Sequence, residues 1–358
     1  MRPAKHTVPP FHAKRLFALL PAFALLLSAC TPPASQAAPT AETTFFAMDT
    51  VMNLRIYEGG DADLLDAAEE RVRELEALWS VTDEGSEIYA LNHEGAAELS
   101  PETADLLDTA LGMCERTDGA LDISIYPVLR AWGFTTGAYA VPSDETLSAL
   151  LSRVDYTLVT QDGTYAALPD GMEIDLGSVA KGCTGDVLAA LLRENGVTSA
   201  LLDLGGNIQT VGARPDGSPW RVGIRDPGGD GNLGVVEVVD QAVVTSGGYE
   251  RYFEVDGVRY WHILDPKTGR PARSGLSSVT VVGGMGTTGD TGAVCDALST
   301  ALFVMGKDGA LDFWRQHRDE WGFELVLVDD SGAVTITAGL ESTFMLGQKG
   351  RILTIAQP

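Results

Sequence analysis

The chain has 358 residues, 45% of them hydrophobic and 21% charged, which is an ordinary globular composition that allows one large core or two smaller ones. Its formal net charge of −25 at pH 7 argues against a nucleic-acid-binding protein, because phosphate backbones require a basic surface. Its 40 glycines predict many tight turns or a site lined by backbone.

The N-terminus has the pattern of an export signal. Basic side chains precede an apolar run over 16–27, which is too short to span a membrane comfortably. The run ends in Leu27-Ser28-Ala29-Cys30, which resembles the lipobox of bacterial lipoproteins, where the cysteine is lipidated after cleavage. We therefore expect residues 1–29 to be a lipoprotein signal peptide. The alternative is an ordinary signal peptide that happens to contain a cysteine.

Lipidation of Cys30 would hold the mature protein at the extracytoplasmic side of a bacterial membrane. The residues that follow are rich in Pro, Ala, Ser and Thr, a composition typical of a flexible tether. Residues 30–42 are therefore expected to be the lipidated cysteine and its tether. Residues 43–358 remain for the folded unit.

Hydrophobic periodicity predicts helices interleaved with strands along this unit. Helices are expected over 63–79, 101–116, 179–195, 291–305 and 310–319. Strands are expected over 43–57, 172–176, 200–204, 279–282, 324–328, 334–337 and 351–355, with short hairpins between 220 and 260. The pattern indicates an α+β fold with mixed sheets and packed helices, forming a single catalytic unit of one or two lobes.

The mature chain after Cys30 holds three cysteines, Cys114, Cys183 and Cys295. An odd number excludes complete pairing in disulfides, and all three lie in apolar contexts typical of small buried residues. No CxxC or Cys/His ligand spacing is present, which argues against a zinc site.

Two motifs contain the residue types of a metal-assisted phosphate site. Asp175 and Lys181 fall where a predicted strand meets a helix, and a lysine in the first helical turn opposes the helix dipole unless an anion is near. Asp296 and Thr300 are four residues apart and share one helix face. Their oxygens suit a hard cation such as Mg²⁺. Taken alone, these residues are equally consistent with helix-end carboxylates and a helix-facing threonine.

Two further segments are less specific. His262 lies close to Asp265 between a strand and a turn, where it is a candidate general base, although a structural histidine is the more common interpretation. Gly205-Gly206-Asn207 follows an apolar strand and allows close approach of a ligand, but a plain turn between strands explains it equally well. The chain has neither GxGxxG at this point nor a Walker loop, so the usual nucleotide-binding folds are not supported.

Seven segments in order together resemble the ApbE family, the FAD:protein FMN transferases, over about residues 43–345. The segments are Met48-Asp49-Thr50; Gly119-Ala120-Leu121-Asp122-Ile123-Ser124 with Trp132-Gly133-Phe134; Asp175-Leu176-Gly177-Ser178-Val179-Ala180-Lys181-Gly182; Asp203-Leu204-Gly205-Gly206-Asn207; Thr245-Ser246-Gly247-Gly248-Tyr249-Glu250-Arg251; His262-Ile263-Leu264-Asp265-Pro266-Lys267-Thr268-Gly269-Arg270-Pro271; and Asp296-Ala297-Leu298-Ser299-Thr300. Each is weak alone, and their shared order is specific.

The resemblance implies an ApbE-like, T-fold-related catalytic unit with FAD as substrate and Mg²⁺ as cofactor. Such enzymes split the FAD pyrophosphate, release AMP and attach FMN through its phosphate to a Thr or Ser hydroxyl of an acceptor flavoprotein. The implied acceptors are subunits of Nqr-type or Rnf-type complexes or other extracytoplasmic flavoproteins.

The resemblance also implies roles for individual residues. Asp296 and Thr300 match side-chain ligands of Mg²⁺, and Ser178 matches a ligand that uses its carbonyl oxygen. His262 matches the histidine that deprotonates the acceptor hydroxyl. The positions that match residues lining FAD are Met48, Trp79, Ala120, Leu121, Asp122, Asp175, Lys181 and Ile263.

Two other functions stay open at this point. A Mg²⁺-dependent FAD pyrophosphatase would release FMN and AMP by using water in place of the acceptor hydroxyl. A non-catalytic flavin-binding lipoprotein would return FAD intact. The combination of Lys181, His262, Asp296 and Thr300 argues against the non-catalytic binder, which would have little reason to keep all four.

Overall fold

The computed structural model describes residues 38–284, 291–348 and 350–358. From residue 38 onward the described chain belongs to one compact unit. The predicted signal peptide, Cys30 and most of the predicted tether lie outside the described residues. Within the described part, no helix combines the length and the apolar character needed to cross a membrane.

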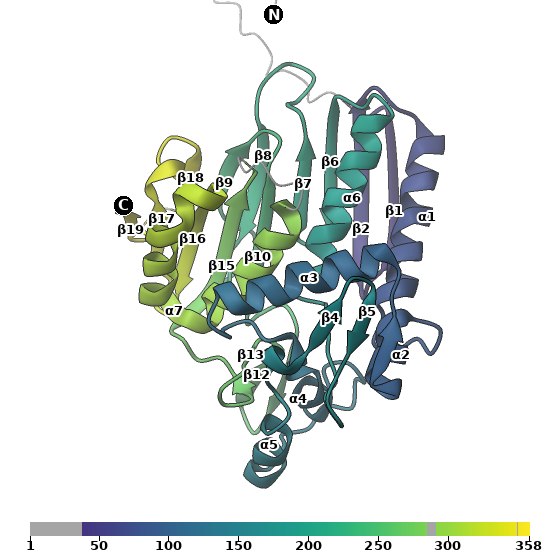
Figure 1. Cartoon of the computed structure of the whole chain (residues 1–358). Coiled ribbons are helices and arrows are strands. Elements are labelled where there is room, and N and C mark those ends of the chain that lie inside the picture. The colour runs from purple at the N-terminus through teal and green to yellow at the C-terminus, as the bar shows by residue number, and fades with distance from the viewer. Residues whose placement is uncertain (1–37, 285–290, 349) are drawn as a thin grey trace, which may run out of the picture. The chain divides into compact units, whose positions relative to one another are not determined.

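A nine-stranded sheet forms the framework of this unit (Figure 1). Neighbouring strands pair antiparallel, except for the last two, which run parallel. In spatial order the strands are β1 (Ala41–Ala47), β2 (Thr50–Glu58), β6 (Ser199–Leu204), β7 (Asn207–Val211), β10 (Ala242–Gly247), β15 (Leu276–Gly283), β16 (Phe323–Asp329), β17 (Val334–Thr337) and β19 (Leu353–Ala356).

The two faces of this sheet are covered differently. One face is covered by the helices α1 (Ala62–Trp79), α6 (Ala180–Glu194) and α7 (Thr291–Trp321) (Figure 1). Adjacent residues of a strand point to opposite faces, so Val244 packs in the core shared with α7 while Val243 packs on the other side. There it meets a small sheet of β8 (Trp220–Arg225), β9 (Asn232–Val238) and β18 (Phe344–Leu346).

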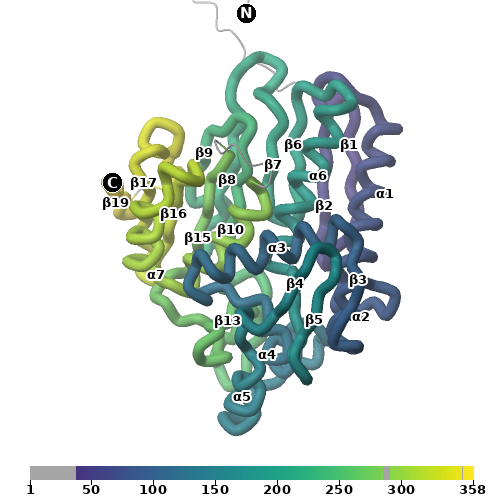
Figure 2. Tube along the Cα trace, viewed as in Figure 1, coloured from purple at the N-terminus to yellow at the C-terminus, as the bar shows by residue number. Residues whose placement is uncertain are grey.

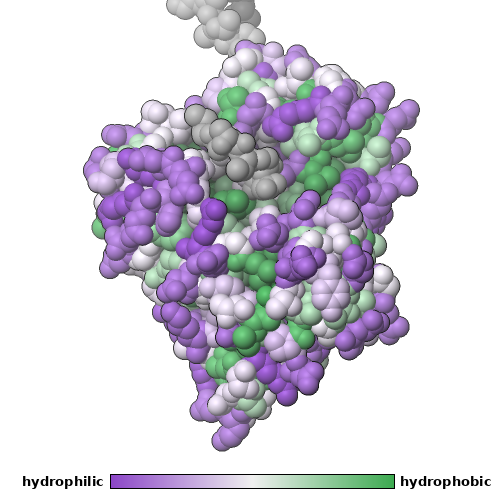
Figure 3. All heavy atoms as spheres, viewed as in Figure 1, coloured by the Kyte–Doolittle hydropathy of each residue, from purple (hydrophilic) through white to green (hydrophobic). Residues whose placement is uncertain are grey.

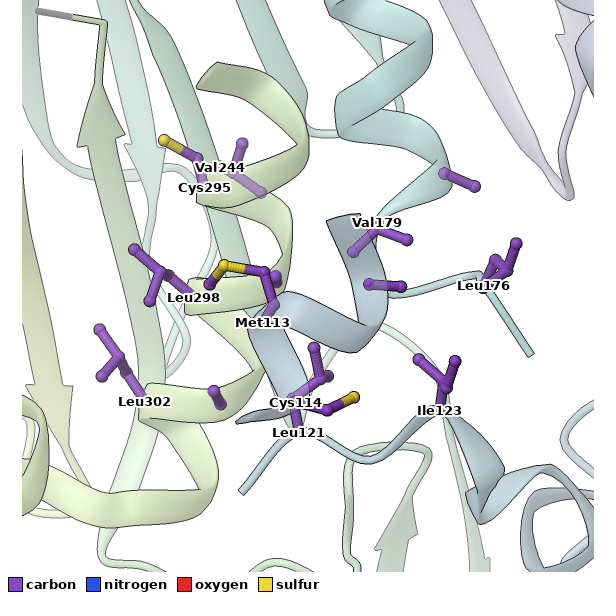
Figure 4. Close-up of a cluster of buried hydrophobic side chains, with 14 of the residues drawn as sticks. Met113, Cys114, Leu121, Ile123, Leu176, Val179, Val244, Cys295, Leu298 and Leu302 are labelled. Atoms are coloured by element: carbon purple, nitrogen blue, oxygen red, sulfur yellow. The ribbon is translucent and has the colours of Figure 1, made fainter. Parts of the chain in front are cut away.

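The remaining elements surround the ends of these helices. In Figure 2, α3 runs across the front of the molecule and contacts α7. In Figure 4, its residues Met113 and Cys114 point into one apolar core with Val179, Leu298 and Leu302. The elements not yet given are α2 (Glu87–Glu94), β3 (Ala96–Glu98), α3 (Pro101–Arg116), η1 (Ile123–Ile125), α4 (Tyr126–Ala131), α5 (Asp144–Leu151), η2 (Tyr156–Leu158), β4 (Thr160–Asp162), β5 (Tyr165–Ala167), β11 (Tyr252–Val255), β12 (Val258–Trp261), β13 (Leu264–Asp265), β14 (Arg270–Pro271) and η3 (Ala338–Leu340).

The predicted α+β class is confirmed, and so are the helices expected over 63–79, 101–116 and 179–195. The helices expected over 291–305 and 310–319 are present as the two halves of α7, separated by Gly306, whose φ of 76° lies outside the helical range. Cys114 and Cys295 are buried as expected, whereas Cys183 is half-buried.

Two strand predictions are wrong. The segment 43–57 is a hairpin, because Met48 and Asp49 adopt positive φ angles of 49° and 59° and turn the chain between β1 and β2. The segment 172–176 forms no strand. Its backbone is held by a side chain instead, since the Asn92 amide donates to the Ile174 carbonyl oxygen at 2.8 Å and accepts from the Ile174 N–H at 2.7 Å.

Candidate active site

A cavity of about 820 Å³ opens beside the ends of β10, α6 and α7. Most residues predicted for the site line its wall, namely Met48, Ala120, Leu121, Asp122, Asp175, Ser178, Lys181, His262, Ile263, Asp296 and Thr300. Trp79 is not among the lining residues; its side chain is 6% exposed and packs in the core. The structure therefore brings together the predicted residues except Trp79.

A close crossing of α6 and α7 positions the metal-type residues. A Cβ atom at Gly182 would lie 2.1 Å from the carbonyl oxygen of Gly292, so both helices need glycine at this contact. Asp186 on α6 accepts hydrogen bonds from the N–H groups of Gly292 and Ala293 at 2.8 and 3.0 Å. This carboxylate satisfies free N–H groups at the start of α7 and fixes the helix that carries Asp296.

Asp296 and Thr300 lie on the cavity side of α7. The Asp296 side chain is 4% exposed, and its Oδ2 accepts a hydrogen bond from the Gly182 N–H at 3.0 Å. Burial raises the pKa of Asp296, while the Lys181 charge and hydrogen bonds oppose the shift. The Oγ1 of Thr300 lies 3.4 Å from the Ser246 hydroxyl on β10.

These groups fit a hard divalent cation. Asp296 is a buried carboxylate on the cavity wall, and Thr300 and Ser178 line the same wall. A cation there would compensate the negative charge that burial disfavours, and oxygen donors are the ligands that Mg²⁺ prefers. Across the described residues no group of three or more His, Cys, Asp and Glu side chains is arranged to hold a metal. The predicted set has only one carboxylate.

The loop before α6 places a second carboxylate on the wall. The Asp175 N–H donates to the Ile123 carbonyl oxygen at 2.9 Å, and Asp175 Oδ1 accepts from the Gly177 N–H at 2.8 Å. Burial raises the pKa of Asp175, and the charges of Arg251 and Lys181 oppose the rise. This loop and the first turn of α6 therefore present Asp175 and Lys181 on the same wall.

Asp122 has a different environment. Its Oδ1 accepts hydrogen bonds from the N–H and the hydroxyl of Ser124 at 2.8 and 2.6 Å, and its Oδ2 accepts from the Tyr156 N–H at 3.2 Å. The side chain is 7% exposed, and burial raises its pKa. Both carboxylate oxygens are thus engaged by the protein, so Asp122 fixes the shape of the wall at Ala120 and Leu121.

His262 stands at the end of β12 and is partly exposed. Its Nδ1 lies 3.3 Å from the carbonyl oxygen of Arg251. A carbonyl oxygen can only accept, so Nδ1 carries the proton and Nε2 keeps its lone pair. Burial, with the charges of Arg251 and Lys181, lowers the pKa of His262 to about 3. The imidazole is therefore neutral at physiological pH, and it becomes an effective base where a bound anion offsets the charges of Arg251 and Lys181.

Several charged residues of the wall were not predicted as site residues, among them Arg225, Glu250 and Arg251. Burial raises the pKa of Glu250 to about 7, against the opposing charges of Lys181 and Arg225. For Glu250 and Arg251 the sequence did contain a signal, the Gly247-Gly248 pair. A glycine pair allows the chain to approach a ligand closely, and the charged residues that follow it then lie near the site. Arg225 had no such signal, because its approach depends on how β8 packs against the main sheet.

Known proteins resemble this chain over most of its length. A family model described as the ApbE family matches residues 48–323. The FAD:protein FMN transferase of Vibrio cholerae is 34% identical over 297 residues, covering 79% of this chain and 86% of its own. That of Treponema pallidum is 34% identical over 318 residues, covering 81% and 85%.

Solved structures give the same result. The ApbE protein of Thermotoga maritima has a TM-score of 0.76 at 34% identity, covering 82% of this chain and 96% of its own. The flavin transferase ApbE of Vibrio cholerae has a TM-score of 0.75 at 27% identity, covering 85% and 98%. The α+β fold of this chain thus has counterparts among solved structures. The chain belongs to the ApbE family.

Proposed function

We propose that this protein is a transferase that moves FMN from FAD to a Thr or Ser hydroxyl of an acceptor protein. The phosphoester bond forms between the acceptor oxygen and the FMN phosphorus, the pyrophosphate P–O bond breaks, and AMP leaves. The supporting observation is that Lys181, His262, Asp296 and Thr300, which are far apart in the sequence, line one cavity. The names of the relatives support the same reaction.

The wall residues have separable tasks in this reaction. The Lys181 ammonium lies close enough to oppose the rise in pKa that burial causes at Asp175, Glu250 and Asp296, so an anionic pyrophosphate placed there would be attracted to it. The neutral Nε2 of His262 takes the proton from the acceptor hydroxyl as that oxygen attacks phosphorus. Asp296, Thr300 and the Ser178 carbonyl would hold Mg²⁺, which supplies charge neutralisation at the phosphate oxygens.

The test uses the fragment 31–358, which contains the whole compact unit. It is incubated with FAD, Mg²⁺ and an unflavinylated acceptor domain of Nqr or Rnf type, and the acceptor is analysed by intact-mass spectrometry. A mass gain of one FMN ester that EDTA prevents is the expected result. Free FMN and AMP without a gain would instead establish a pyrophosphatase. Recovery of FAD without either product would support a non-catalytic flavin-binding protein.

The acceptor is proposed to be an extracytoplasmic flavoprotein, because the N-terminal pattern is that of an exported lipoprotein. Lipidation of Cys30 is checked by expressing the full chain and a Cys30→Ser variant in a bacterium. The wild type is expected in the membrane fraction with an acylated N-terminal cysteine. Recovery of the wild type in the soluble fraction with an unmodified cysteine would contradict the anchor.

A further inference from the structure

The β11–β12 hairpin carries an apolar surface beside the cavity. Asp256 and Gly257 form its two-residue turn with positive φ angles of 52° and 76°. Because side chains alternate along a strand, Val255 and Val258 share a face with the inner residues Phe253 and Tyr260. The two valines form the last cross-strand pair before the turn and are 40% and 41% exposed.

A column of aromatic rings supports this face. The ring of Tyr139 stacks on Phe253 at 5.0 Å, and Phe253 stacks on Tyr260 at 5.4 Å. Tyr139 itself is 50% exposed, and nearby in sequence Val141 is 41% exposed. We call Tyr139, Val255 and Val258 the hairpin patch. In Figure 3, hydrophobic surface is visible in the region of α4, α5 and β13.

The hairpin patch is directly connected to the proposed base. The hairpin starts after Arg251 and ends before His262, and the His262 N–H donates to the Arg251 carbonyl oxygen at 3.1 Å. The ring of Phe134 lies 5.8 Å from that of Tyr139 and 6.2 Å edge-on from that of His262. The exposed valines therefore stand at the tip of a hairpin whose closed end carries His262.

The charge of this region differs from that of the whole chain. Residues 251–273 contain five basic side chains and three acidic ones, whereas the chain has a net charge of −25. Arg259 lies over the Tyr252 ring at 4.1 Å, and Arg273 lies over the Trp261 ring at 4.9 Å, so two of the guanidinium groups are held on the hairpin itself. Arg259 is paired with Glu254 at 3.1 Å and Arg270 with Asp144, so the attraction for an acidic segment comes from the other basic side chains, Lys267 and Arg273 among them.

We propose that the hairpin patch is the docking surface for the acceptor protein, and that it binds an apolar and acidic segment next to the hydroxyl that receives FMN. This inference rests on the proposed transferase function, since it requires a macromolecular second substrate. Large rigid aromatic rings with exposed aliphatic neighbours and a charged rim are the surface type that supports binding hot spots.

The test compares Val258→Asp, Val258→Lys and Tyr139→Ser with the wild type, using an unflavinylated Nqr-type acceptor domain. Val239→Asp is the matched control, because Val239 is 42% exposed and does not line the cavity. We expect Val258→Asp and Tyr139→Ser to raise the KM for the acceptor about tenfold, while the Kd for FAD stays unchanged. Val258→Lys should be less harmful than Val258→Asp, because an acidic partner tolerates a cation. Circular dichroism confirms folding of each variant.

The outcomes separate the two proposals. Equal KM values for the wild type, Val258→Asp and Tyr139→Ser, with transfer intact, would overturn the docking surface and leave the transferase function standing. Equal effects of Val258→Asp and Val258→Lys would overturn its acidic part. If the wild type splits FAD but transfers nothing to the domain, the transferase function fails, and the docking inference fails with it.

Discussion

The Gly182 N–H at the start of α6 donates a hydrogen bond to the Asp296 carboxylate on α7, at 3.0 Å. One oxygen of Asp296 therefore stabilises the N-terminus of α6, where free N–H groups favour a negative charge. The same carboxyl lines the cavity. Asp296 therefore has two roles, accepting the hydrogen bond that holds α6 and supplying a negative charge to the cavity. A substitution that keeps the hydrogen bond but removes the charge can separate these roles.

Asp296→Asn is expected to remove the Mg²⁺-dependent activity without unfolding the protein. The asparagine oxygen still accepts from Gly182, but the charge is lost. The rate of FAD cleavage should fall by roughly 100-fold or more, which is the scale for one preorganised charge in a water-excluded site. The control is Asp312→Asn, since that side chain on the same helix is 69% exposed. Unchanged Mg²⁺ dependence would contradict the assignment of Asp296 to the metal.

Gly182→Ala should destabilise the fold by about 1–3 kcal/mol, the usual cost of overpacking. Its Cβ would meet the Gly292 carbonyl oxygen of the crossing helix. The matched change is Gly112→Ala in α3, where a Cβ meets nothing within 4 Å. That variant should be neutral or up to about 1 kcal/mol more stable, because alanine favours helix. Urea unfolding measures both, and equal effects would refute the tight crossing.

His262→Gln should impair transfer to the acceptor more than FAD binding. Glutamine keeps a side-chain amide that can donate to the Arg251 carbonyl, but it cannot accept a proton near neutral pH. We expect the transfer rate to fall by about 10²–10⁴-fold, the range for loss of a general base. Fluorescence titration of FAD, paired with acceptor mass, measures the two effects. A matching loss of FAD binding would argue against the base role.

The lowered pKa of His262 also predicts how the free energy of unfolding depends on pH. The fold lowers it to about 3 from 6.5, so the unfolded chain binds a proton that the native chain excludes between these values. The free energy of unfolding contributed here falls as pH drops from 6.5 toward 3. His262→Gln should therefore lose less stability than the wild type between pH 7 and pH 5 in urea titrations.

Glu250→Gln is a control in which the pH-dependent change in the free energy of unfolding has the opposite sign. The fold raises the pKa of Glu250 to about 7 from 4.5, so the native chain holds a proton that the unfolded chain releases in this range. Acidification from pH 7 to pH 5 then stabilises the native state through this group. Glu250→Gln should lose more stability than the wild type over the same interval. Identical pH profiles for all three proteins would contradict both shifts.

Asn92→Ala should loosen the loop that presents Asp175. It would leave the N–H and C=O of Ile174 without their present partners, at a cost of about 1–3 kcal/mol for each buried unsatisfied group. Weaker FAD binding is expected with the fall in stability. Asn195→Ala is the comparison, since Asn195 is exposed and its side-chain amide donates to the carbonyl oxygen of Leu191 at its helix end. Similar losses in both variants would contradict a special role for Asn92.

The helices of the fold followed from local patterns, whereas much of the site did not. Apolar spacing predicted α1 and α3 closely because each buries one stripe against the core. The strand predicted over 172–176 failed because its backbone is bonded by Asn92, a residue remote in sequence. Periodicity carries no information about such a partner.

Motif order, and not periodicity, predicted the residues that line the cavity. Lys181 and Asp296 follow from the resemblance to the ApbE family, and the structure places both on one wall. Arg225 was not predicted as a site residue because it belongs to β8, whose position relative to the site is set by sheet packing. Trp79 was placed near FAD by correspondence, but its helix directs the ring into the core.

The placement of Arg251 and His262 at the two ends of one hairpin has a consequence for how such enzymes diversify. Their direct backbone hydrogen bond closes the hairpin below its tip. Residues of the tip can therefore change in sequence without moving the imidazole. Under the proposed docking, the choice of acceptor can therefore change within a short exposed segment while the reaction centre is kept.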